Sequence, residues 1–489
     1  MKSPIILALD IGTSSVRAAL YDGEADLIPQ TSVKIEYSFT STVDGGAEID
    51  TTYAIDRVVA AIDQVLKKTI KIKGEIEYVA SCSFWHSLVG VDARGNHTPV
   101  VLGWADTRSR AFTDVLKKRF DESATHNRTG ARFHSSYWPA KLMWLRSEFP
   151  DAFSKAAVLL SFSDLLSLRF FGEMATGVSM ASGTGIFDIR KCTWDSELIR
   201  FLKIKLAMLP TVAAEGQTFQ LNGKFAKRWP RLADSRWFPV IGDGAADNIG
   251  SECVTGDRAA LMIGTSGAMR VAYKGGPPTH IPDGLWCYRI DKDRVILGGA
   301  LSDGGGFYRW LKTNLKIPPR AEDEMRRRGA ASHGIIFLPF LSGERSTGYN
   351  DDAKGAILGL TMFHDSVDIL QAGIESVAYR FAEIFDRLNS IVTIKQIVAS
   401  GGALKQSPVW TKILADVLGC DLVISPTSES SSRGAVLLAL ESIDKIGKIE
   451  NIQSASGSNV AYHPECHAIY RIARKQHQKE YDLESPTPK

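Results

Sequence analysis

Two turns of matching sequence carry groups that could bind an anion. Residues 8–23 read ALDIGTSSVRAALYDG, and residues 260–275 read ALMIGTSGAMRVAYKG. Each copy places a Gly-Thr-Ser turn between two apolar runs, which is the pattern of a β-hairpin. Glycine lets backbone N–H groups approach an anion, and the Thr and Ser hydroxyls add donors. One copy alone equally fits a hairpin without a ligand, whereas two matched copies predict a pair of phosphate-binding turns.

Carboxylates beside these turns could direct a metal ion and accept a proton. Asp10 precedes the first turn, but Met262 holds the same position in the second, so only the first copy offers a carboxylate to Mg²⁺. Arg17 adds positive charge beside the phosphates. Asp243, in the segment WFPVIGDGAADNIG, could accept the proton of a hydroxyl that attacks the γ-phosphorus. The residues alone also fit an Asp243 that only caps the next helix, and Asp247 is a rival base expected within that helix.

Aromatic and polar side chains gather in three short clusters of the first half. These are Phe84-Trp85-His86, Trp104-Ala105-Asp106-Thr107-Arg108 and Tyr137-Trp138-Pro139-Ala140-Lys141. Sugars present many hydroxyls and apolar C–H faces, so their pockets combine fixed hydrogen-bonding groups with aromatic rings. Taken singly, each aromatic residue also fits a place in the core, and His86 fits a buried histidine with satisfied hydrogen bonds. Together the clusters suggest a polyol site.

Strands and helices alternate around these groups, which predicts an α/β fold. The repeated turn, about 250 residues apart, predicts two homologous lobes and no short-period solenoid. Apolar spacing and caps predict helices over 51–70 (capped by Thr51 or Asp50), 367–388 and 409–418 (capped by Ser407), and strands over 78–84 and 396–400. The last strand leads into Gly401-Gly402, a turn type that often faces a ligand at the carboxyl edge of a sheet.

Composition excludes several classes of protein. The chain has 489 residues and a net charge of +3 with both signs spread along it, so we expect two to four domains and no nucleic-acid partner. Six scattered cysteines form no C-x-x-C pair, which favours a reducing cytoplasm over disulfides or zinc. The apolar run 5–9 is too short for a signal peptide or a membrane span. The P-loop, protein-kinase and H-E-x-x-H motifs do not occur.

At these motifs the sequence resembles the FGGY family of carbohydrate kinases, within the actin/hexokinase/heat-shock ATPase fold. The resemblance covers nearly the whole chain. The segments 10–14, 264–267 and 400–403 resemble the first phosphate, second phosphate and adenosine motifs. The segments 141–145 and 355–360, the latter running on to Ile374-Glu375, resemble the two family signatures. Gly373 departs slightly, because family members usually carry a somewhat larger small residue there.

The resemblance implies an α/β, two-domain actin/hexokinase-like (ribonuclease H-like) ATPase fold with the active site in the interdomain cleft. Its expected domains are 1–245, with the sugar site and the first phosphate motif, and 246–489, with the second phosphate and adenosine motifs. The implied partners are a small sugar, ATP and Mg²⁺, in a cytoplasmic protein that binds neither nucleic acid nor a membrane. A homodimer is left open.

The resemblance also implies a role for each candidate residue. Asp243 is the expected catalytic base, and Asp10 the expected holder of Mg²⁺ through water. The phosphates are expected beside Gly12, Thr13, Ser14, Arg17, Gly264 and Thr265. The adenine and ribose are expected beside Gly305, Gly306, Gly402 and Gln406, although asparagine is more usual at position 406. The sugar is expected beside Trp85, His86, Asp106, Arg108, Tyr137 and Asp243.

The substrate suggested by the second and third clusters is gluconate, because both look most like the gluconokinase-like branch. A cationic Arg108 would suit a carboxylate substrate. Trp85-His86 keeps a xylulokinase, or another ketopentose or polyol kinase, as the alternative. A chaperone or filament-type ATPase and an inactive sugar sensor share the fold. Asp243 before the second turn and the sugar-like clusters argue against the former, and the presence of both Asp10 and Asp243 argues against the latter.

Overall fold

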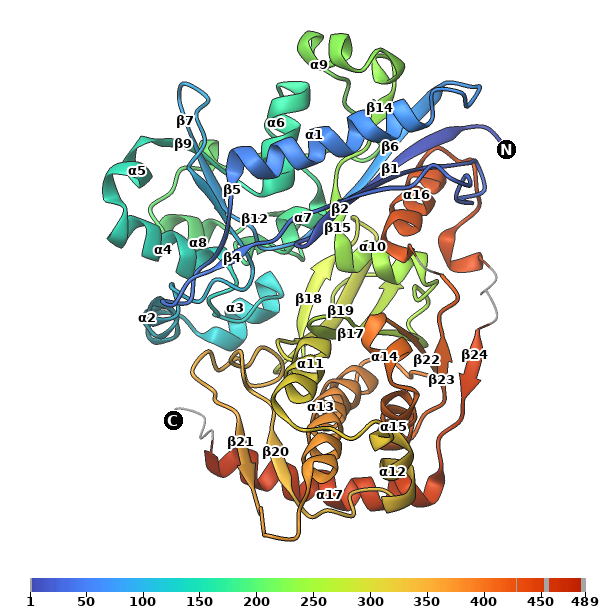
Figure 1. The fold of residues 1–489 in the computed structure, drawn as a ribbon. Coiled ribbons are helices and arrows are strands. Elements are labelled where there is room, and N and C mark those ends of the chain that lie inside the picture. Colours follow the sequence, from blue (N-terminus) through green and yellow to red (C-terminus); the bar gives the residue numbers. More distant parts are fainter. Residues whose placement is uncertain (1, 428, 453–456, 485–489) are drawn as a thin grey trace.

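Two α/β lobes make up the structure, a computed structural model that describes residues 2–427, 429–452 and 457–484 (Figure 1). The lobe drawn blue to green contains most of the first half of the chain, and the lobe drawn yellow to red contains most of the second. Each lobe is built on a central mixed sheet. The predicted two-lobed α/β fold is confirmed.

The N-terminal lobe is centred on a six-stranded sheet of order β14-β6-β1-β2-β3, with β15 also pairing with β6. Strands β14, β15 and β1 run parallel to β6, and the β1–β2–β3 meander is antiparallel. The strands are β1 (Ile5–Ile11), β2 (Ser15–Tyr21), β3 (Val33–Glu36), β6 (Ile76–Ser83), β14 (Arg236–Trp237) and β15 (Ile241–Gly242).

Strand β1 reads as a continuous apolar run because both faces of its sheet are covered. Its odd-numbered residues, such as Leu7 and Leu9, share a core with Val58 and Ile62 of helix α1 (Thr51–Lys68). Its even-numbered residues, such as Ile6, share another core with residues of helices α10 (Asp243–Gly250) and α16 (Ser430–Ser442). The period of two along a strand sorts these side chains to opposite faces.

The C-terminal lobe is centred on a seven-stranded sheet of order β18-β19-β17-β16-β22-β23-β24. Helix α13 (Ser366–Asn389) packs on β17 and β19. The strands are β16 (Arg258–Ile263), β17 (Gly267–Lys274), β18 (Trp286–Arg289), β19 (Arg294–Leu301), β22 (Gln396–Ser400), β23 (Leu422–Ile424) and β24 (Ser458–Val460).

The sequence repeat is a structural repeat. In the first lobe an antiparallel meander β1–β2–β3 is flanked by the parallel strand β6, and in the second β16–β17–β19 is flanked by the parallel strand β22. Both predicted hairpins are present. Their registers differ, because Ile11 pairs with Val16 in the first hairpin and Ile263 pairs with Gly267 in the second. The first turn is therefore one residue longer.

The other predicted elements form close to their expected bounds. The predicted helix 51–70 is α1, and the Asp50 side chain accepts a hydrogen bond from the Tyr53 amide at 2.7 Å. The predicted strands are β6 and β22. The predicted helix 409–418 is α15 (Pro408–Leu418), capped by Ser407 as expected. A short helix that was not predicted, α14 (Gly402–Gln406), fills the gap between β22 and α15.

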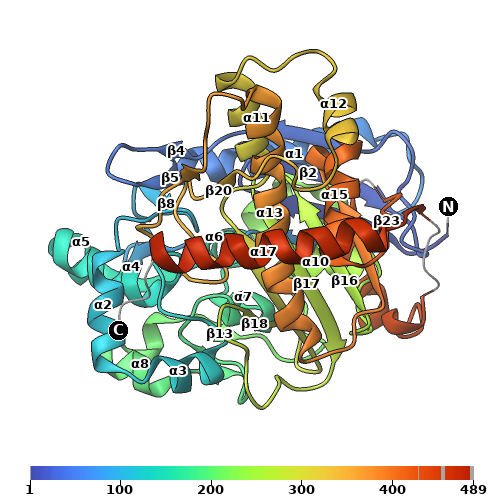
Figure 2. The same ribbon diagram turned by 90° about the horizontal axis from the view of Figure 1, so that it is seen from below.

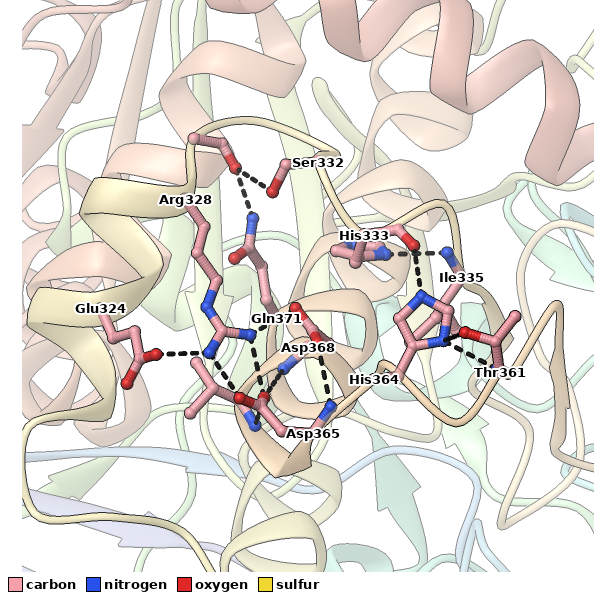
Figure 3. A network of polar contacts seen from close by, with 12 residues as sticks. Glu324, Arg328, Ser332, His333, Ile335, Thr361, His364, Asp365, Asp368 and Gln371 are labelled. Atoms are coloured by element: carbon pink, nitrogen blue, oxygen red, sulfur yellow. Dashed lines mark hydrogen bonds and ion pairs between the residues drawn. The ribbon is translucent and has the colours of Figure 1, made fainter.

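Helix α13, predicted over 367–388, is anchored at its first turn by a polar network (Figure 3). Asp365 and Asp368 form a capping box, and Arg328 of helix α12 (Ala321–Arg328) forms ion pairs with both carboxylates and with Glu324. Charge-assisted contacts to an N-cap acid stabilise the helix start. Helix α17 (Pro464–Glu484) contacts α13 and, in the view from below, crosses in front of it (Figure 2).

Helices α10 and α16 link the two lobes. Although α16 lies near the end of the chain, it packs on β1 and β6 of the first lobe and on α10 (Figure 1). Helix α10 also contacts β15 and β17, which belong to different sheets. Because α10 spans residues 243–250, it crosses the predicted boundary at 245/246, and that boundary stays a prediction.

The remaining helices and strands lie outside the two central sheets. Within the described residues, no helix is both long enough and apolar enough to cross a membrane. The remaining helices of six or more residues are α2 (Ala111–Arg119), α3 (Glu122–Thr129), α4 (Trp138–Glu148), α5 (Pro150–Lys155), α6 (Phe162–Phe171), α8 (Ser196–Phe201), α9 (Gly223–Arg228) and α11 (Gly305–Asn314). The remaining strands of three or more residues are β5 (Ala47–Asp50), β7 (Val89–Asp92), β8 (Val100–Leu102), β9 (Ala156–Leu160), β20 (Ile336–Leu338) and β21 (Ala356–Leu358).

Candidate active site

Three neighbouring parallel strands end at one edge of the first sheet and present the candidate residues there. Strand β1 leads into Gly12, β6 leads through Phe84 into Trp85 and His86, and β15 leads into Asp243. The three strands end in register, because Ile11 and Gly242 both pair with Ser83. The carboxyl edge of such a sheet is the usual ligand edge of an α/β protein.

The first turn is a compact loop with an accessible tip. The Gly12 amide donates to the Ser15 carbonyl at 3.0 Å, and the Tyr37 amide donates to the Ser14 carbonyl at 3.0 Å. The Tyr37 hydroxyl also donates to the Gly12 carbonyl. Thr13 is half-buried and Ser14 is exposed. The backbone is therefore fixed while the two hydroxyl side chains stay within reach of a ligand, although their phosphate contacts stay predictions.

Asp10 and Arg17 are direct cross-strand partners in β1 and β2, and their side chains form an ion pair of 3.1 Å. Burial raises the pKa of the Asp10 carboxyl above its ordinary value, while Arg17 lowers it. Arg17 also lies 3.5 Å from Glu429, which precedes α16. Arg17 therefore sits beside the first turn as expected, but between two carboxylates.

Asp243 begins helix α10, half-buried, and its carboxylate accepts a hydrogen bond from the Gly244 amide at 2.8 Å. Burial raises the pKa of Asp243 to about 7; the charge of Arg270 opposes this shift, and the nearby carboxylate of Asp10 adds to it. A carboxyl whose pKa lies near neutrality is suited to exchange a proton in a reaction at neutral pH. Asp243 therefore has the acidity that a general base needs, and its catalytic role stays a prediction.

Asp247 lies one turn further along α10, where it was expected, and is fully engaged in structural contacts. Its carboxylate forms a buried ion pair of 3.0 Å with Arg270 and accepts a hydrogen bond of 2.5 Å from the Ser430 hydroxyl. Arg270 holds this carboxylate, and the serine belongs to α16. These contacts occupy the Asp247 carboxylate, so Asp243 stays the predicted base.

The second turn packs against the start of helix α11. The Gly305 amide donates to the Gly264 carbonyl and the Gly306 amide to the Thr265 carbonyl, both at 2.8 Å. A Cβ atom on Gly305 would lie 2.3 Å from the Gly264 oxygen, so this approach requires glycine.

A pocket of about 420 Å³ opens between the second turn, α11 and α14. Five of the residues expected at the nucleotide line it, and Gly306 lies directly behind Thr265. Helix α11 adds residues that the motifs did not indicate. They follow Gly305 by three, four, seven and eight positions, which is the spacing of one helix face and the signal that could have indicated them. The lining residues are Gly264, Thr265, Gly305, Tyr308, Arg309, Lys312, Thr313, Gly402, Ala403 and Gln406.

Trp85 and His86 join a cluster of aromatic rings that spans both lobes. The His86 ring lies 5.0 Å from that of Tyr137 and 5.7 Å from that of Tyr288, in β18 of the C-terminal lobe. The hydroxyls of Tyr137 and Tyr288 are 2.6 Å apart. Burial lowers the pKa of His86 well below its ordinary value, so the ring is neutral. Tyr288 has no motif around it, and sequence reasoning missed it.

Trp85 connects this cluster to the candidate base. Its indole nitrogen donates to the Ser179 carbonyl at 3.0 Å, and the Ser179 hydroxyl accepts from the Gly242 amide at 3.0 Å. A Cβ on Gly242 would lie 1.9 Å from the Trp85 ring. Asp243 and the aromatic cluster are therefore adjacent.

Asp106 and Arg108 face each other. The Arg108 guanidinium forms an ion pair of 2.6 Å with Asp106 and a second, of 2.5 Å, with Glu48, and it lies 4.7 Å from the Trp144 ring. Both carboxylates are largely buried. The charge of Arg108 is already balanced within the first lobe, so its role toward a carboxylate substrate stays a prediction.

The carboxylates at this edge suit a Mg²⁺ ion that is held mainly by water and phosphate oxygens. Over the described parts of the chain, no group of three or more His, Cys, Asp or Glu side chains could form a complete metal cage. Asp10 and Asp243 lie close enough for the charge of Asp10 to raise the pKa of Asp243. Mg²⁺ typically takes one or two carboxylates and completes its shell with water and substrate phosphates.

Comparison with known proteins gives a consistent result. The model of the FGGY family of carbohydrate kinases, N-terminal domain, matches residues 5–244, and that of the C-terminal domain matches residues 259–442. A gluconokinase of Bacillus subtilis (strain 168) is 26% identical over 475 residues, which is 94% of this chain and 91% of that protein. Crystal structures of a gluconate kinase and of a ligand-bound xylulose kinase, both from Lactobacillus acidophilus, each match 99% of both chains at a TM-score of 0.90, with 27% and 26% identity.

Proposed function

The chain belongs to the FGGY family of carbohydrate kinases, and from this premise we propose that it transfers the γ-phosphoryl group of ATP to a hydroxyl of gluconate. The observation that carries the proposal is the position of Asp243. It stands at the shared edge of β15, β6 and β1, next to Asp10 and beside the aromatic cluster of Trp85 and His86. The proposed active site lies between the lobes.

Asp243 would act on the sugar hydroxyl. Its pKa near 7 lets the carboxylate accept the hydroxyl proton as the oxygen attacks phosphorus. Arg270, held by Asp247, supplies a fixed positive charge that keeps the carboxylate form accessible. Phosphoryl transfer depends mainly on positioning and on charge neutralisation. A base fixed at the end of a strand would hold the attacking hydroxyl in position.

The two glycine turns would hold the triphosphate from opposite lobes. Thr13, Ser14 and Arg17 lie at the first turn, and Gly264 and Thr265 lie at the second, where the 420 Å³ pocket continues toward Gly402 and Gln406. That pocket would receive the adenosine. Backbone N–H groups in glycine turns form anion-binding concavities, which suits phosphate oxygens.

Asp10 would orient a Mg²⁺ ion through water. The bound ion supplies charge neutralisation on the phosphate oxygens. Arg17, 3.1 Å from Asp10, fixes the orientation of that carboxylate.

Similarity to a gluconokinase and to a gluconate kinase along nearly the whole chain supports gluconate, although xylulose and glycerol kinases match a similar share of the chain. Xylulose is the second candidate, because a ligand-bound xylulose kinase matches the fold with the same TM-score. His86 beside a large aromatic residue was also the feature that suggested xylulose. The two candidate substrates differ in charge, because gluconate carries a carboxylate and xylulose is neutral. An enzyme can discriminate strongly between a charged and a neutral substrate.

The test is the rate of ADP release in a coupled assay with gluconate, xylulose, ribulose and glycerol. We expect gluconate to give the highest kcat/KM. A higher kcat/KM for xylulose would move the assignment to a ketopentose kinase, and no stimulation by any of the four sugars would refute the proposed function.

A further inference from the structure

Arg345 is a cation at the sugar end of the proposed site. It belongs to the loop 339–355 between β20 and β21 of the C-terminal lobe. Its guanidinium carbon lies 4.8 Å from the centroid of the Trp104 ring, which belongs to the N-terminal lobe. Among the described residues, no acidic side chain forms an ion pair with it. Arg108, in contrast, is matched by two acids.

The neighbours of Arg345 in the chain fix its direction. Glu344 is buried, forms an ion pair with Arg380 of α13, and accepts a hydrogen bond of 2.7 Å from the Tyr481 hydroxyl of α17. Ser346 is also buried; its hydroxyl accepts a hydrogen bond of 3.0 Å from the Ala300 amide, and its own amide donates to the Ala300 carbonyl at 3.0 Å. Both flanking side chains point into the C-terminal lobe, so the half-buried Arg345 between them extends toward the other lobe.

The anchoring of this loop extends to the N-terminal lobe. The Asp351 carboxylate lies 2.9 Å from the His134 ring nitrogen Nε2 and accepts a hydrogen bond of 2.8 Å from the Ser135 hydroxyl. These two residues lie two and three positions before Tyr137. The loop therefore bridges the lobes at the sugar side, and Arg345 lies between its two anchored ends.

The charge of Arg345 acts on the residues expected around the sugar. Burial lowers the pKa of His86 well below its ordinary value, and the charge of Arg345 lowers it further. Burial also lowers the pKa of Lys141 to about 7, and Arg345 again adds to the effect. The ammonium group of Lys141 donates to the carbonyls of Ser136 and His86, so it is occupied. Arg345 therefore stays available to an anionic ligand at this end of the site.

We infer that Arg345 binds the carboxylate of the sugar-acid substrate and thereby sets the preference of the enzyme for aldonates over neutral sugars. The inference deepens the proposed function and rests on it. A half-buried charge without a counter-charge is costly, and an incoming carboxylate would supply one. The planar guanidinium offers two parallel N–H donors to a carboxylate, and stacking on Trp104 orients that plane.

The test compares gluconate with D-glucitol, which has a CH₂OH group in place of the carboxylate. In Arg345→Gln we expect kcat/KM for gluconate to fall roughly 30- to 100-fold, the range for losing a hydrogen bond to a charged group. The values of kcat/KM for glucitol and KM for ATP should change less than about threefold. The matched control is Arg110→Gln, an exposed arginine 3.7 Å from Asp352 at the same junction, which should leave all three values unchanged.

Arg345→Lys keeps the charge but loses the two-pronged geometry, so it should retain more gluconate activity than Arg345→Gln. It also provides a second folded variant if the glutamine variant unfolds. Equal losses on gluconate and glucitol, a raised KM for ATP instead, or a wild-type enzyme that prefers a neutral sugar would each overturn the inference while leaving the kinase assignment intact. No ADP release by the wild type with any sugar would overturn the proposed function, and the inference with it.

Discussion

Replacing Asp243 with asparagine should make the protein inactive and more stable at the same time. The carboxylate is half-buried beside Asp10, and its pKa is raised from 3.8 to about 7. An acid with a raised pKa in the folded state costs stability above its ordinary pKa, because folding then works against ionisation. Asparagine has nearly the same shape, can still accept the 2.8 Å hydrogen bond from the Gly244 amide, and carries no charge.

The size of the effect follows from the pKa shift. Each pKa unit corresponds to about 1.4 kcal/mol, so the Asp243 carboxylate costs the folded state about 4 kcal/mol at pH 8 but under about 2 kcal/mol at pH 5. The free energy of unfolding of Asp243→Asn should therefore exceed that of the wild type, and the excess should grow as the pH rises from 5 to 8. Activity should move the other way, with kcat reduced by about 10² to 10⁴ through loss of the base.

The assay is urea unfolding followed by circular dichroism at pH 5 and pH 8, combined with kcat on the same samples. Asp247→Asn is the matched control, because it breaks the buried 3.0 Å ion pair with Arg270 and should lower stability by about 3 kcal/mol. If Asp243→Asn proves less stable than the wild type at pH 8, or if its stability difference does not change with pH, the reasoning about this carboxylate is refuted.

Three further predictions concern the base, the nucleotide pocket and the metal. Because Asp243 accepts a proton only as the carboxylate, kcat/KM should rise with pH up to about 7 and then level off; a pH-independent kcat/KM between pH 5 and 8 would contradict this role. Gly305→Ala places a Cβ 2.3 Å from the Gly264 oxygen, so calorimetry should show ADP binding weakened about tenfold or more, whereas Gly276→Ala, with open space around it, should bind normally. Removing Mg²⁺ with EDTA should abolish ADP release, and excess MgCl₂ should restore it; turnover that persists in EDTA would rule out the proposed metal role.

The parts of the fold that the sequence predicted are those set by local chemistry. The two hairpins follow from a glycine turn between apolar runs, and helices such as α1 and α15 follow from their caps and apolar spacing. The family motifs also predicted that Gly264, Gly305, Gly402 and Gln406 lie beside one nucleotide. In the structure these four residues line one pocket. The contacts that sequence reasoning missed join segments that are far apart in the chain.

Arg108 and Arg345 show why contacts between distant segments could not be predicted from the sequence. From its sequence Arg108 looks like a free cation among aromatic residues, but Glu48, sixty residues earlier, supplies a second counter-charge. Arg345 carries no local signal, because its exposure to the sugar side depends on Arg380 and Tyr481 holding its neighbour Glu344. The packing of α16 on the sheet of the other lobe is likewise invisible to any local pattern.

The most direct test of the whole account is a phosphorus NMR spectrum of ATP, Mg²⁺ and gluconate incubated with the enzyme. We expect one new phosphomonoester resonance that grows in step with ADP and does not appear with Asp243→Asn. ADP accompanied by inorganic phosphate alone would mean that water, and not a sugar hydroxyl, receives the phosphoryl group, and would contradict the account.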